Sequence, residues 1–493
     1  MQKQPAYVNY FFKGGYVDLW RTVKSTFTYV KYNIIDAAHD IANAWFYLAL
    51  YFGSAIGGIF TFSYDWEAIG QTFKGLWKLA YGIGKLICIL VLTTSICIMF
   101  SLLHVVVLAV IMLIAYLLFL IWLGIDALYR GIKKISSNCP NCQEHFSLPV
   151  YICPDCGEEH THLYPSRYGI WKRKCLCGCK LPTTFFNGRG KLEARCPSCG
   201  TDVKDGGNHV DVCIPVVGGR SSGKTCFISQ AITAIGECAP SLNLEYEYSA
   251  TDYDDYEQNA QGMEQGYLPD ATSDLRLKYY QFYLSPENAK LKNLISLCDV
   301  AGEVYSNKDN LGGQIGYKYA NAFLMVVDPL SVERFRREMS KSADPVDYGY
   351  SNDRLDEVLS MLISTLENMF CITSKDMLKT TVAVVFSKCD APGIDSLIGK
   401  EAVDKYIRSN EVKSRYDVQN IVCEQFLKSY GEANFLNTLK SKFKSVQFFT
   451  SSALGHNQDG TPFVSDGVED PVLWLIDSAC ASINLKDRWG KKL

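Results

Sequence analysis

The sequence predicts an α/β protein in which a domain built on a mostly parallel sheet is preceded by an α-helical hairpin and a cysteine-rich module. Three features carry this prediction: an uncharged run over residues 86–125, nine cysteines within residues 139–199, and a glycine-rich loop at residues 218–225 between an apolar run and a helical pattern. At roughly 100–200 residues per domain, 493 residues leave room for several domains. The predicted boundaries are 1–135, 136–205 and 208–493.

The overall composition excludes several classes of protein. The chain has 49 basic and 52 acidic residues and a formal net charge of -3, so no nucleic-acid partner is expected. An aromatic content of 13% is too high for a disordered chain. The N-terminus lacks a basic start followed by an apolar core, so no signal peptide is expected. The cysteine-rich part should face the reducing cytosol.

The first region is expected to lie in a membrane, because no Asp, Glu, Lys or Arg occurs from Leu86 to Ile125. As one helix this run would be about 60 Å long, twice the roughly 30 Å hydrocarbon core, so we predict two spans joined by a turn near Ser101–His104. A buried helical core is the alternative, but such helices rarely exceed about 25 residues without a charge. Basic residues flank the run and should keep both of its ends on the cytosolic side: Lys74, Lys78, Lys85, Arg130, Lys133 and Lys134.

A second uncharged stretch, Ile41–Tyr64, leaves the number of spans open. It can form a further span or a helix on the membrane surface. A third span would place the basic N-terminal residues outside, against the usual charge bias, so two spans are favoured. We therefore predict a multi-pass membrane protein whose other two regions lie on the cytoplasmic side.

The second region is predicted to be a zinc-ribbon module. Its cysteines form four closely spaced pairs, mostly beside Pro and Gly: Cys139/Cys142, Cys153/Cys156, Cys175/Cys177 and Cys196/Cys199. Four pairs supply two tetrahedral four-cysteine sites for two structural Zn²⁺ ions, with no open position for catalysis. We expect sequential pairing, the first two pairs at one ion and the last two at the other. Cys179 is then spare, or it takes the place of Cys175. Iron–sulfur ligation is the alternative.

The third region opens with a strand, a phosphate-binding loop and a helix. The apolar run V-C-I-P-V-V leads into G-G-R-S-S-G-K-T, and C-F-I-S-Q-A-I-T-A-I follows at helical spacing. In such a loop the backbone N–H groups converge on phosphates, Lys224 reaches the β and γ phosphates, and Thr225 gives its hydroxyl to Mg²⁺. The nucleotide-binding residues predicted here are Gly218, Gly219, Arg220, Ser221, Ser222, Gly223, Lys224, Thr225 and Cys226.

Later motifs predict that the base is guanine. One strand ends at Asp299, for the Mg²⁺ shell, and is followed by Gly302, whose N–H meets the γ phosphate. The strand T-V-A-V-V-F leads to S-K-C-D, in which the Asp390 carboxylate can accept from both N1 and N2 of guanine, whereas adenine would leave it unpaired. Each motif follows an apolar strand, and ligands of parallel sheets gather at that edge. The predicted base-binding residues are Ser387, Lys388, Asp390, Ser452 and Ala453.

With these motifs, residues 210–485 resemble the Ras-like P-loop GTPases of the translation-factor-related class. The layout of membrane segment, C-P-x-C ribbons and one such domain also resembles the bacterial double-GTPase families, although only one phosphate loop is found. The resemblance implies a P-loop NTPase fold with GTP or GDP and Mg²⁺ as ligands. It also implies a switch threonine before the second strand, which would bind Mg²⁺ as well. Thr272 is expected there, and Thr251, which lies further from the strand, is the alternative.

The sequence departs from the family pattern at three positions. Ser387 replaces the asparagine that ties the guanine loop to the phosphate loop, so weaker binding is expected. Glu303 stands where Ras-like enzymes carry a water-orienting glutamine, and Arg220 lies where small residues are common. With Gly302 and Thr272, these two form the candidate catalytic set. We expect a slow GTPase switch that meets an unknown protein partner through the zinc module or the switch loops. A GTP-binding membrane scaffold without turnover is the alternative.

Overall fold

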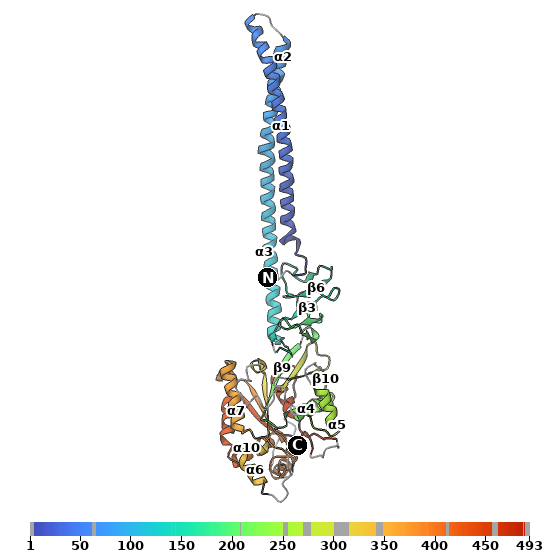
Figure 1. Cartoon of the computed structure of the whole chain (residues 1–493), viewed down its shortest axis with the longest axis vertical. Coiled ribbons are helices and arrows are strands. Elements are labelled where there is room, and N and C mark those ends of the chain that lie inside the picture. Colours follow the sequence, from blue (N-terminus) through green and yellow to red (C-terminus); the bar gives the residue numbers. More distant parts are fainter. Residues whose placement is uncertain are drawn as a thin grey trace. The chain divides into compact units, whose positions relative to one another are not determined.

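The computed structural model describes residues 4–61, 66–139, 141–142, 144–207, 209–249, 255–269, 278–299, 315–341, 349–391, 393–410, 414–455, 462–486 and 488. The chain forms two compact units (Figure 1). The first comprises Met1–Leu128, Cys153–Glu158 and Leu163–Arg189, and the second comprises Tyr129–Ile152, Glu159–His162 and Gly190–Leu493. The cysteine-rich region, predicted as one module, therefore contributes to both units.

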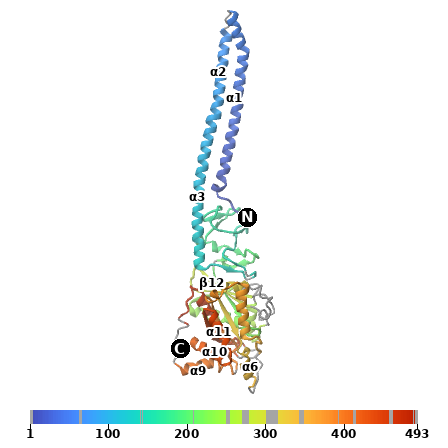
Figure 2. The same cartoon turned by 90° about the vertical axis from the view of Figure 1, so that its left-hand side faces the viewer.

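The first unit is dominated by an antiparallel pair of long helices. α1 (Gly14–Thr61) packs against α2 (Trp66–Cys88), which continues through a π-helical turn, η2 (Ile89–Thr93), into α3 (Thr94–Lys133). Figure 2 shows α1 and α2 side by side. The turn predicted near Ser101–His104 is wrong, because α3 is unbroken there.

The sequence of α3 offers nothing that ends a helix at the predicted turn. Neither Gly nor Pro occurs from Thr94 to Leu123, and apolar residues continue on both sides of Ser101. A helix pairs its backbone groups within the segment, so it continues wherever the surroundings are apolar and no breaker intervenes. The chain instead reverses between α1 and α2, where residues 62–65 lie outside the described part of the chain.

Small residues allow α1 and α2 to approach closely. They recur at intervals of seven on the facing surfaces: Ala37, Ala44, Ala68, Gly75 and Gly82. A Cβ added to Gly82 would lie 2.8 Å from Cγ1 of Ile41, and one added to Gly75 would lie 3.2 Å from Cγ of Leu48. Neither glycine leaves room for a larger side chain without displacing its neighbour. The spacing of seven therefore favours one register of the two helices.

Within the described residues, one continuous helix, Trp66–Lys133, is long and apolar enough to cross a membrane. Only 11% of its most apolar stretch is buried inside the protein. This indication comes from length and composition alone. The large apolar side chains of α3 are mostly exposed, so most of them do not pack into the core of the first unit.

Both ends of the helical pair bind the same cysteine-bearing segment, residues 163–189. Before α1, the Tyr7 N–H donates to the carbonyl oxygen of Lys174 at 3.0 Å. On α3, the carboxylate of Asp126 lies 2.8 Å from the guanidinium of Arg189, and both side chains are fully buried. The beginning of α1 and the C-terminal part of α3 are therefore held at one place in the first unit.

The second unit is built on a seven-stranded sheet of order β10-β11-β12-β9-β13-β14-β15. The central strand β9 is parallel to β12 and β13, and parallel pairing continues through β14 to β15. Antiparallel pairing in this sheet is confined to β10–β11 and β11–β12, so the predicted mostly parallel sheet is confirmed. The strands are β9 (His209–Val217), β10 (Leu244–Tyr248), β11 (Lys278–Pro286), β12 (Lys292–Asp299), β13 (Ala322–Val327), β14 (Thr381–Phe386) and β15 (Ser445–Thr450).

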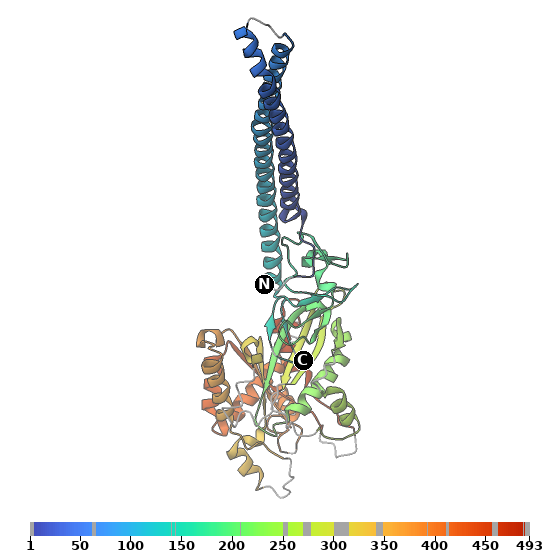
Figure 3. The same cartoon turned by 45° about the horizontal axis from the view of Figure 1, so that its top comes forward.

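Helices cover both faces of this sheet (Figure 3). On β9, Val216 packs with α4 and α12, while Val217 belongs to the opposite core with α6, α7, α10 and α11, as strand alternation requires. The helices are α4 (Lys224–Cys238), α5 (Tyr256–Glu264), α6 (Glu333–Met339), α7 (Leu355–Ser364), α8 (Ser374–Met377), α9 (Lys400–Ser409), α10 (Arg415–Ser429), α11 (Ala433–Lys442) and α12 (Glu469–Ala479). The loops that follow the parallel strands converge at one edge of the sheet.

Short antiparallel strands directly precede the cysteine pairs in both units. In the first unit, β5 (Lys172–Lys174) pairs with β6 (Lys180–Pro182). The second unit contains the pair β1 (Ser137–Asn138) and β2 (His145–Phe146), and a sheet in the order β4 (Glu159–His160), β3 (Val150–Ile152), β7 (Ala194–Arg195) and β8 (Asp202–Val203). Strands this short bury little apolar surface, so bound metal is expected to supply much of their folding free energy.

Candidate functional site

The phosphate loop joins the central strand of the sheet to α4. β9 ends at Val217 and α4 begins at Lys224, so the loop lies at the carboxyl edge of the sheet. The Lys224 side chain is folded into the loop, where Nζ donates to the carbonyl oxygens of Gly218 at 3.0 Å and Gly219 at 2.9 Å. Burial lowers the pKa of this lysine. A buried ammonium among backbone groups is suited to bind a phosphate.

Thr225 and Asp299 lie together beside this loop. Asp299 is the last residue of β12, and its Oδ2 accepts from the Thr225 hydroxyl at 3.2 Å. Its other oxygen, Oδ1, is buried and has no hydrogen-bond partner among the described residues. Burial raises the pKa of Asp299. An unpartnered carboxylate oxygen beside a hydroxyl fits Mg²⁺, which takes oxygen ligands, so these two residues are suited to hold that ion.

The S-K-C-D loop follows β14 and contacts the phosphate loop. The Ser387 hydroxyl donates to the carbonyl oxygen of Ser222 at 2.9 Å, and Lys388 Nζ donates to that of Ser221 at 3.2 Å. The two loops approach closely enough for the short side chain of Ser387 to make this contact, while the weaker nucleotide binding expected from the sequence stays a prediction. Asp390 lies half-buried two residues beyond Lys388.

The loop after β15 lies next to the S-K-C-D loop. The Cys389 N–H donates to the carbonyl oxygen of Ser451 at 3.2 Å, which brings Ser452 and Ala453 to the same edge. The Ser452 backbone is held by two hydrogen bonds to Asp466, of 2.9 and 2.8 Å. The structure thus brings together the residues that the sequence assigned to the phosphates and to the base.

Part of the predicted catalytic set lies outside the described residues: Thr272, Gly302 and Glu303, together with the alternative switch residue Thr251. Their roles stay predictions. Arg220 is described and lies exposed in the phosphate loop. Its backbone N–H donates to Oδ2 of Asp353 at 2.6 Å.

Two further carboxylates lie at this edge: Asp328, for which the sequence predicts only a helix cap, and Asp353, which the sequence analysis missed. Asp328 directly follows β13 and accepts from the Leu330 N–H at 2.9 Å, which caps the next helical turn. Its other oxygen lies 2.8 Å from Lys388 Nζ, and the side chain is fully buried. A polar residue directly after an apolar strand was a signal for Asp328, just as for Asp299. Asp353 lies in an irregular segment before α7 and had no such signal.

The eight predicted zinc ligands gather into two groups of four thiols. Within each group the Sγ atoms all lie within 4.8 Å of one another. Four Sγ–Sγ distances are 3.5 Å for Cys139–Cys199 and 3.6 Å for Cys142–Cys196, Cys153–Cys177 and Cys156–Cys175. Tetrahedral zinc with Zn–S bonds of about 2.3 Å needs sulfur atoms about 3.8 Å apart, so both groups fit zinc.

The predicted sequential pairing of the cysteines is wrong. The second unit holds Cys139, Cys142, Cys196 and Cys199, and the first unit holds Cys153, Cys156, Cys175 and Cys177. Pairing of β3 with β7 explains this arrangement, in which one site is nested within the other along the sequence. β3 ends at Ile152 and β7 begins at Ala194, and the residues between these two strands form a site of their own. Cys179 belongs to neither group, and Cys175 keeps its predicted place.

A glycine after the second cysteine shapes two of these turns. Gly157 and Gly200 have φ angles of +72° and +77°. Their N–H groups donate to the carbonyl oxygens of Cys153 at 2.9 Å and Cys196 at 3.1 Å. Glycine adopts this backbone conformation without strain, which explains the C-P-x-C-G pattern at both positions.

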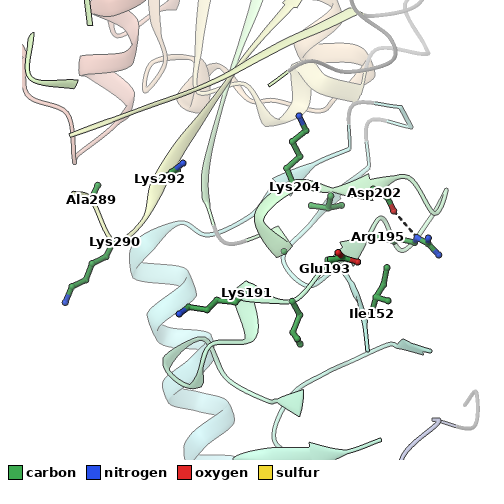
Figure 4. Close-up of a pocket in the computed structure, with 14 residues that line it drawn as sticks. Ile152, Lys191, Glu193, Arg195, Asp202, Lys204, Ala289, Lys290 and Lys292 are labelled. Atoms are coloured by element: carbon green, nitrogen blue, oxygen red, sulfur yellow. Dashed lines mark hydrogen bonds and ion pairs between the residues drawn. The ribbon is translucent and has the colours of Figure 1, made fainter. Parts of the chain in front are cut away.

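A cavity of about 620 Å³ elsewhere in the second unit is separate from the phosphate loop. Its cationic lining residues are Lys191, Arg195, Lys204, Lys290 and Lys292. Figure 4 shows that their labelled side chains point in different directions, and Arg195 is paired with Asp202 at 2.9 Å. The lining of this cavity does not converge on one ligand. The candidate nucleotide site is therefore assigned to the glycine-rich loop, on the chemistry of its residues.

Solved structures with similarity to this chain include sup35 complexed with GDP and LeoA, a bacterial dynamin GTPase from ETEC. The sup35 match has 13% identity and a TM-score of 0.22, and it covers 52% of this chain and 42% of that one. The LeoA match has 13% identity and a TM-score of 0.21, and it covers 54% of this chain and 33% of that one. The chain thus spans less than half the length of either protein. No curated protein gives a significant match.

The family comparison covers the nucleotide site itself. A model of the family described as Double-GTPase 2 matches residues 212–460, just over half of the 493-residue chain. This stretch contains the phosphate loop, Asp299 and the S-K-C-D loop. The chain belongs to the Double-GTPase 2 family.

Proposed function

We propose that this protein is a membrane-anchored guanine-nucleotide switch whose zinc-binding segments serve as a cytosolic adaptor. The observation that carries the nucleotide part is the meeting of three loops: Ser387 and Lys388 contact the phosphate loop, and Thr225 meets Asp299. A phosphate loop alone would suit many nucleotides. The S-K-C-D loop adds Asp390, a carboxylate that matches the two donors of guanine.

Each residue of this edge has a proposed role. Lys224 neutralises charge on the β and γ phosphates, and Asp390 accepts from guanine. Thr225 and Asp299 hold Mg²⁺, which when bound neutralises charge on the phosphate oxygens. By family resemblance, Thr272 would add a ligand to that ion. These roles together support binding of GTP or GDP with Mg²⁺.

Nucleotide titration of the full chain in detergent tests this assignment. Leaving Asp390 unpaired costs about 1–3 kcal/mol, so GTP analogues should bind about 5- to 150-fold more tightly than ATP analogues. Asp390→Ala should reduce that preference, whereas Lys224→Ala should weaken binding of both nucleotides. Glu401→Ala, an exposed carboxylate on α9, should change neither affinity. Equal affinities for GTP and ATP in the wild type would overturn the guanine assignment.

We further propose that the helical pair crosses the membrane as a hairpin, with both ends on the cytosolic side. The contacts of Tyr7 and Asp126 with the same segment, residues 163–189, support a hairpin with both ends on one side. Two parts of a chain that bind one segment lie on one side of a membrane, so the number of crossings between them is even. This favours two spans over three: the continuous helix of α2 and α3 would supply one, and α1, which contains most of the uncharged stretch Ile41–Tyr64, would supply the other.

Epitope tags and protease protection in sealed vesicles test the topology. Tags at the N-terminus and the C-terminus should be accessible from the cytosolic face, and a tag inserted between α1 and α2 should be accessible only from the other face. If all three tags lie on one side, the helices do not cross the membrane. If the N-terminus alone lies on the far side, the number of spans is odd.

A GTP-binding scaffold without turnover is the second candidate function. It is favoured by Glu303, a carboxylate in the place of the water-orienting glutamine of Ras-like enzymes. A negative side chain there would repel a γ phosphate that is already charged. Single-turnover hydrolysis by the full chain separates the two candidates, because a scaffold releases no phosphate above the uncatalysed rate.

A further inference from the structure

Residues 349–353, the irregular segment before α7, lie directly against the phosphate loop. Oδ2 of Asp353 accepts from the Arg220 N–H at 2.6 Å. A Cβ built on Gly219 would lie 2.5 Å from Oγ of Ser351 and 3.0 Å from Oδ2 of Asp353, so the two segments are in contact. A carboxylate is therefore fixed to a loop whose expected ligand is an anion.

The same segment also contacts the lysine of the S-K-C-D loop. Lys388 Nζ donates to the carbonyl oxygen of Gly349 at 2.6 Å and to Oδ2 of Asp328 at 2.8 Å. That carboxylate oxygen also accepts from the Ser351 N–H at 3.0 Å. Residues 349–353 thus join the loop that faces the phosphates to the loop that faces the base, and this gives Asp353 a defined position.

The charge of Asp353 acts on the lysine of the phosphate loop. Burial lowers the pKa of Lys224, while the carboxylates of Asp299 and Asp353 act in the opposite direction. Lys224 is also the residue that should bind the β and γ phosphates. Lys224 donates to the carbonyl oxygen of Gly219, and Asp353 lies against Gly219, so Asp353 and a terminal phosphate would act on the same part of the loop, where their like charges repel each other.

We infer that Asp353 is a specificity-determining residue that lowers the affinity of the site for GTP relative to GDP. This inference rests on the proposed nucleotide site. GDP ends at the β phosphate, whereas GTP carries additional negative charge toward the part of the loop that holds the Asp353 carboxylate. GTP binding accordingly favours release of Asp353 from the Arg220 N–H, and GDP binding tolerates the contact.

Competition of GTP and GDP against a fluorescent GDP analogue tests this inference with the full chain in detergent and Mg²⁺. Asp353→Asn removes the charge but keeps an oxygen for the Arg220 N–H, so GTP affinity should rise on the order of tenfold relative to GDP affinity. Asp353→Ser, a smaller neutral residue, should shift the ratio in the same direction. Asp353→Glu keeps the charge and should keep the ratio. Glu357→Gln, an exposed carboxylate in the first turn of α7, is the matched control and should change nothing.

The outcomes separate this inference from the proposed function. If both neutral variants bind GDP and show the wild-type ratio of affinities, the inference alone is overturned. The same holds if Asp353→Asn and Glu357→Gln shift the ratio equally, because the effect would then be general electrostatics. A wild-type chain that binds neither GDP nor GTP would overturn the proposed function and this inference together.

Discussion

The buried ion pair between Asp126 and Arg189 attaches residues 163–189, which carry Cys175 and Cys177, to α3. Their charged groups are 2.8 Å apart, and both side chains are 0% exposed. Arg189 also donates to the carbonyl oxygens of Leu163 at 2.9 Å and Thr183 at 2.7 Å. The second oxygen of Asp126 accepts from the Phe185 N–H at 3.0 Å. Replacement of Asp126 is therefore predicted to loosen residues 163–189.

The size of this effect follows from burial. Asp126→Ala leaves the guanidinium of Arg189 buried without its counter-charge, and breaking a buried pair in this way costs about 3–5 kcal/mol. The two carbonyl contacts of Arg189 remain, so we expect the lower end, about 3 kcal/mol. That value corresponds to a change of about a hundredfold in the docking equilibrium of the segment. Because the segment carries Cys175 and Cys177, a zinc ion held at the predicted site should be released much faster.

Zinc transfer from the full chain to a chromogenic chelator measures this prediction. In Asp126→Ala, one of the two ions should leave much faster than in the wild type, and the other should leave at the wild-type rate. Asp202→Ala is the control, since it breaks an ion pair with Arg195 in which both partners are exposed, and such pairs contribute about 0–1 kcal/mol. Asp126→Leu combined with Arg189→Met should recover part of the loss. Identical release from the wild type and Asp126→Ala would refute the reasoning.

Cys153→Ser combined with Cys175→Ser should remove one zinc ion by elemental analysis, because both thiols belong to one site; loss of both ions would support sequential pairing instead. Burial raises the pKa of Asp211 to about 7. The folded state therefore keeps a proton on this carboxyl group that the unfolded state releases, and the stability that this gives at low pH is lost as the pH rises. Between about pH 5.5 and pH 7 the free energy of unfolding of the wild type, measured with urea, should fall by about 2 kcal/mol relative to that of Asp211→Asn. If the two free energies change with pH in parallel, this prediction is contradicted. Hydrolysis without partners should be slower than about 10⁻² per second, and Glu303→Gln should preserve or raise it; a fast rate abolished by Glu303→Gln would show that Glu303 acts as a base.

Much of the nucleotide site could be predicted from the sequence because its signals are local. The phosphate loop needs its glycines and Lys224 in consecutive order, and Asp299 and Ser387 each follow an apolar strand. Parallel strands bring such residues to one edge, so the order of motifs already implied their meeting. The four cysteine pairs were recognisable for the same reason, since both members of each pair lie within a few residues.

The tertiary structure decided which distant segments meet. The cysteine pairs are nested because β3 pairs with β7. The chain reverses before α2, and not near Ser101, because neither Gly nor Pro occurs from Thr94 to Leu123. Asp353 reaches the Arg220 N–H across 133 residues of sequence. A motif specifies the chemistry of neighbouring residues, whereas contacts between distant segments depend on the free energy of packing whole strands and helices, which no single motif carries.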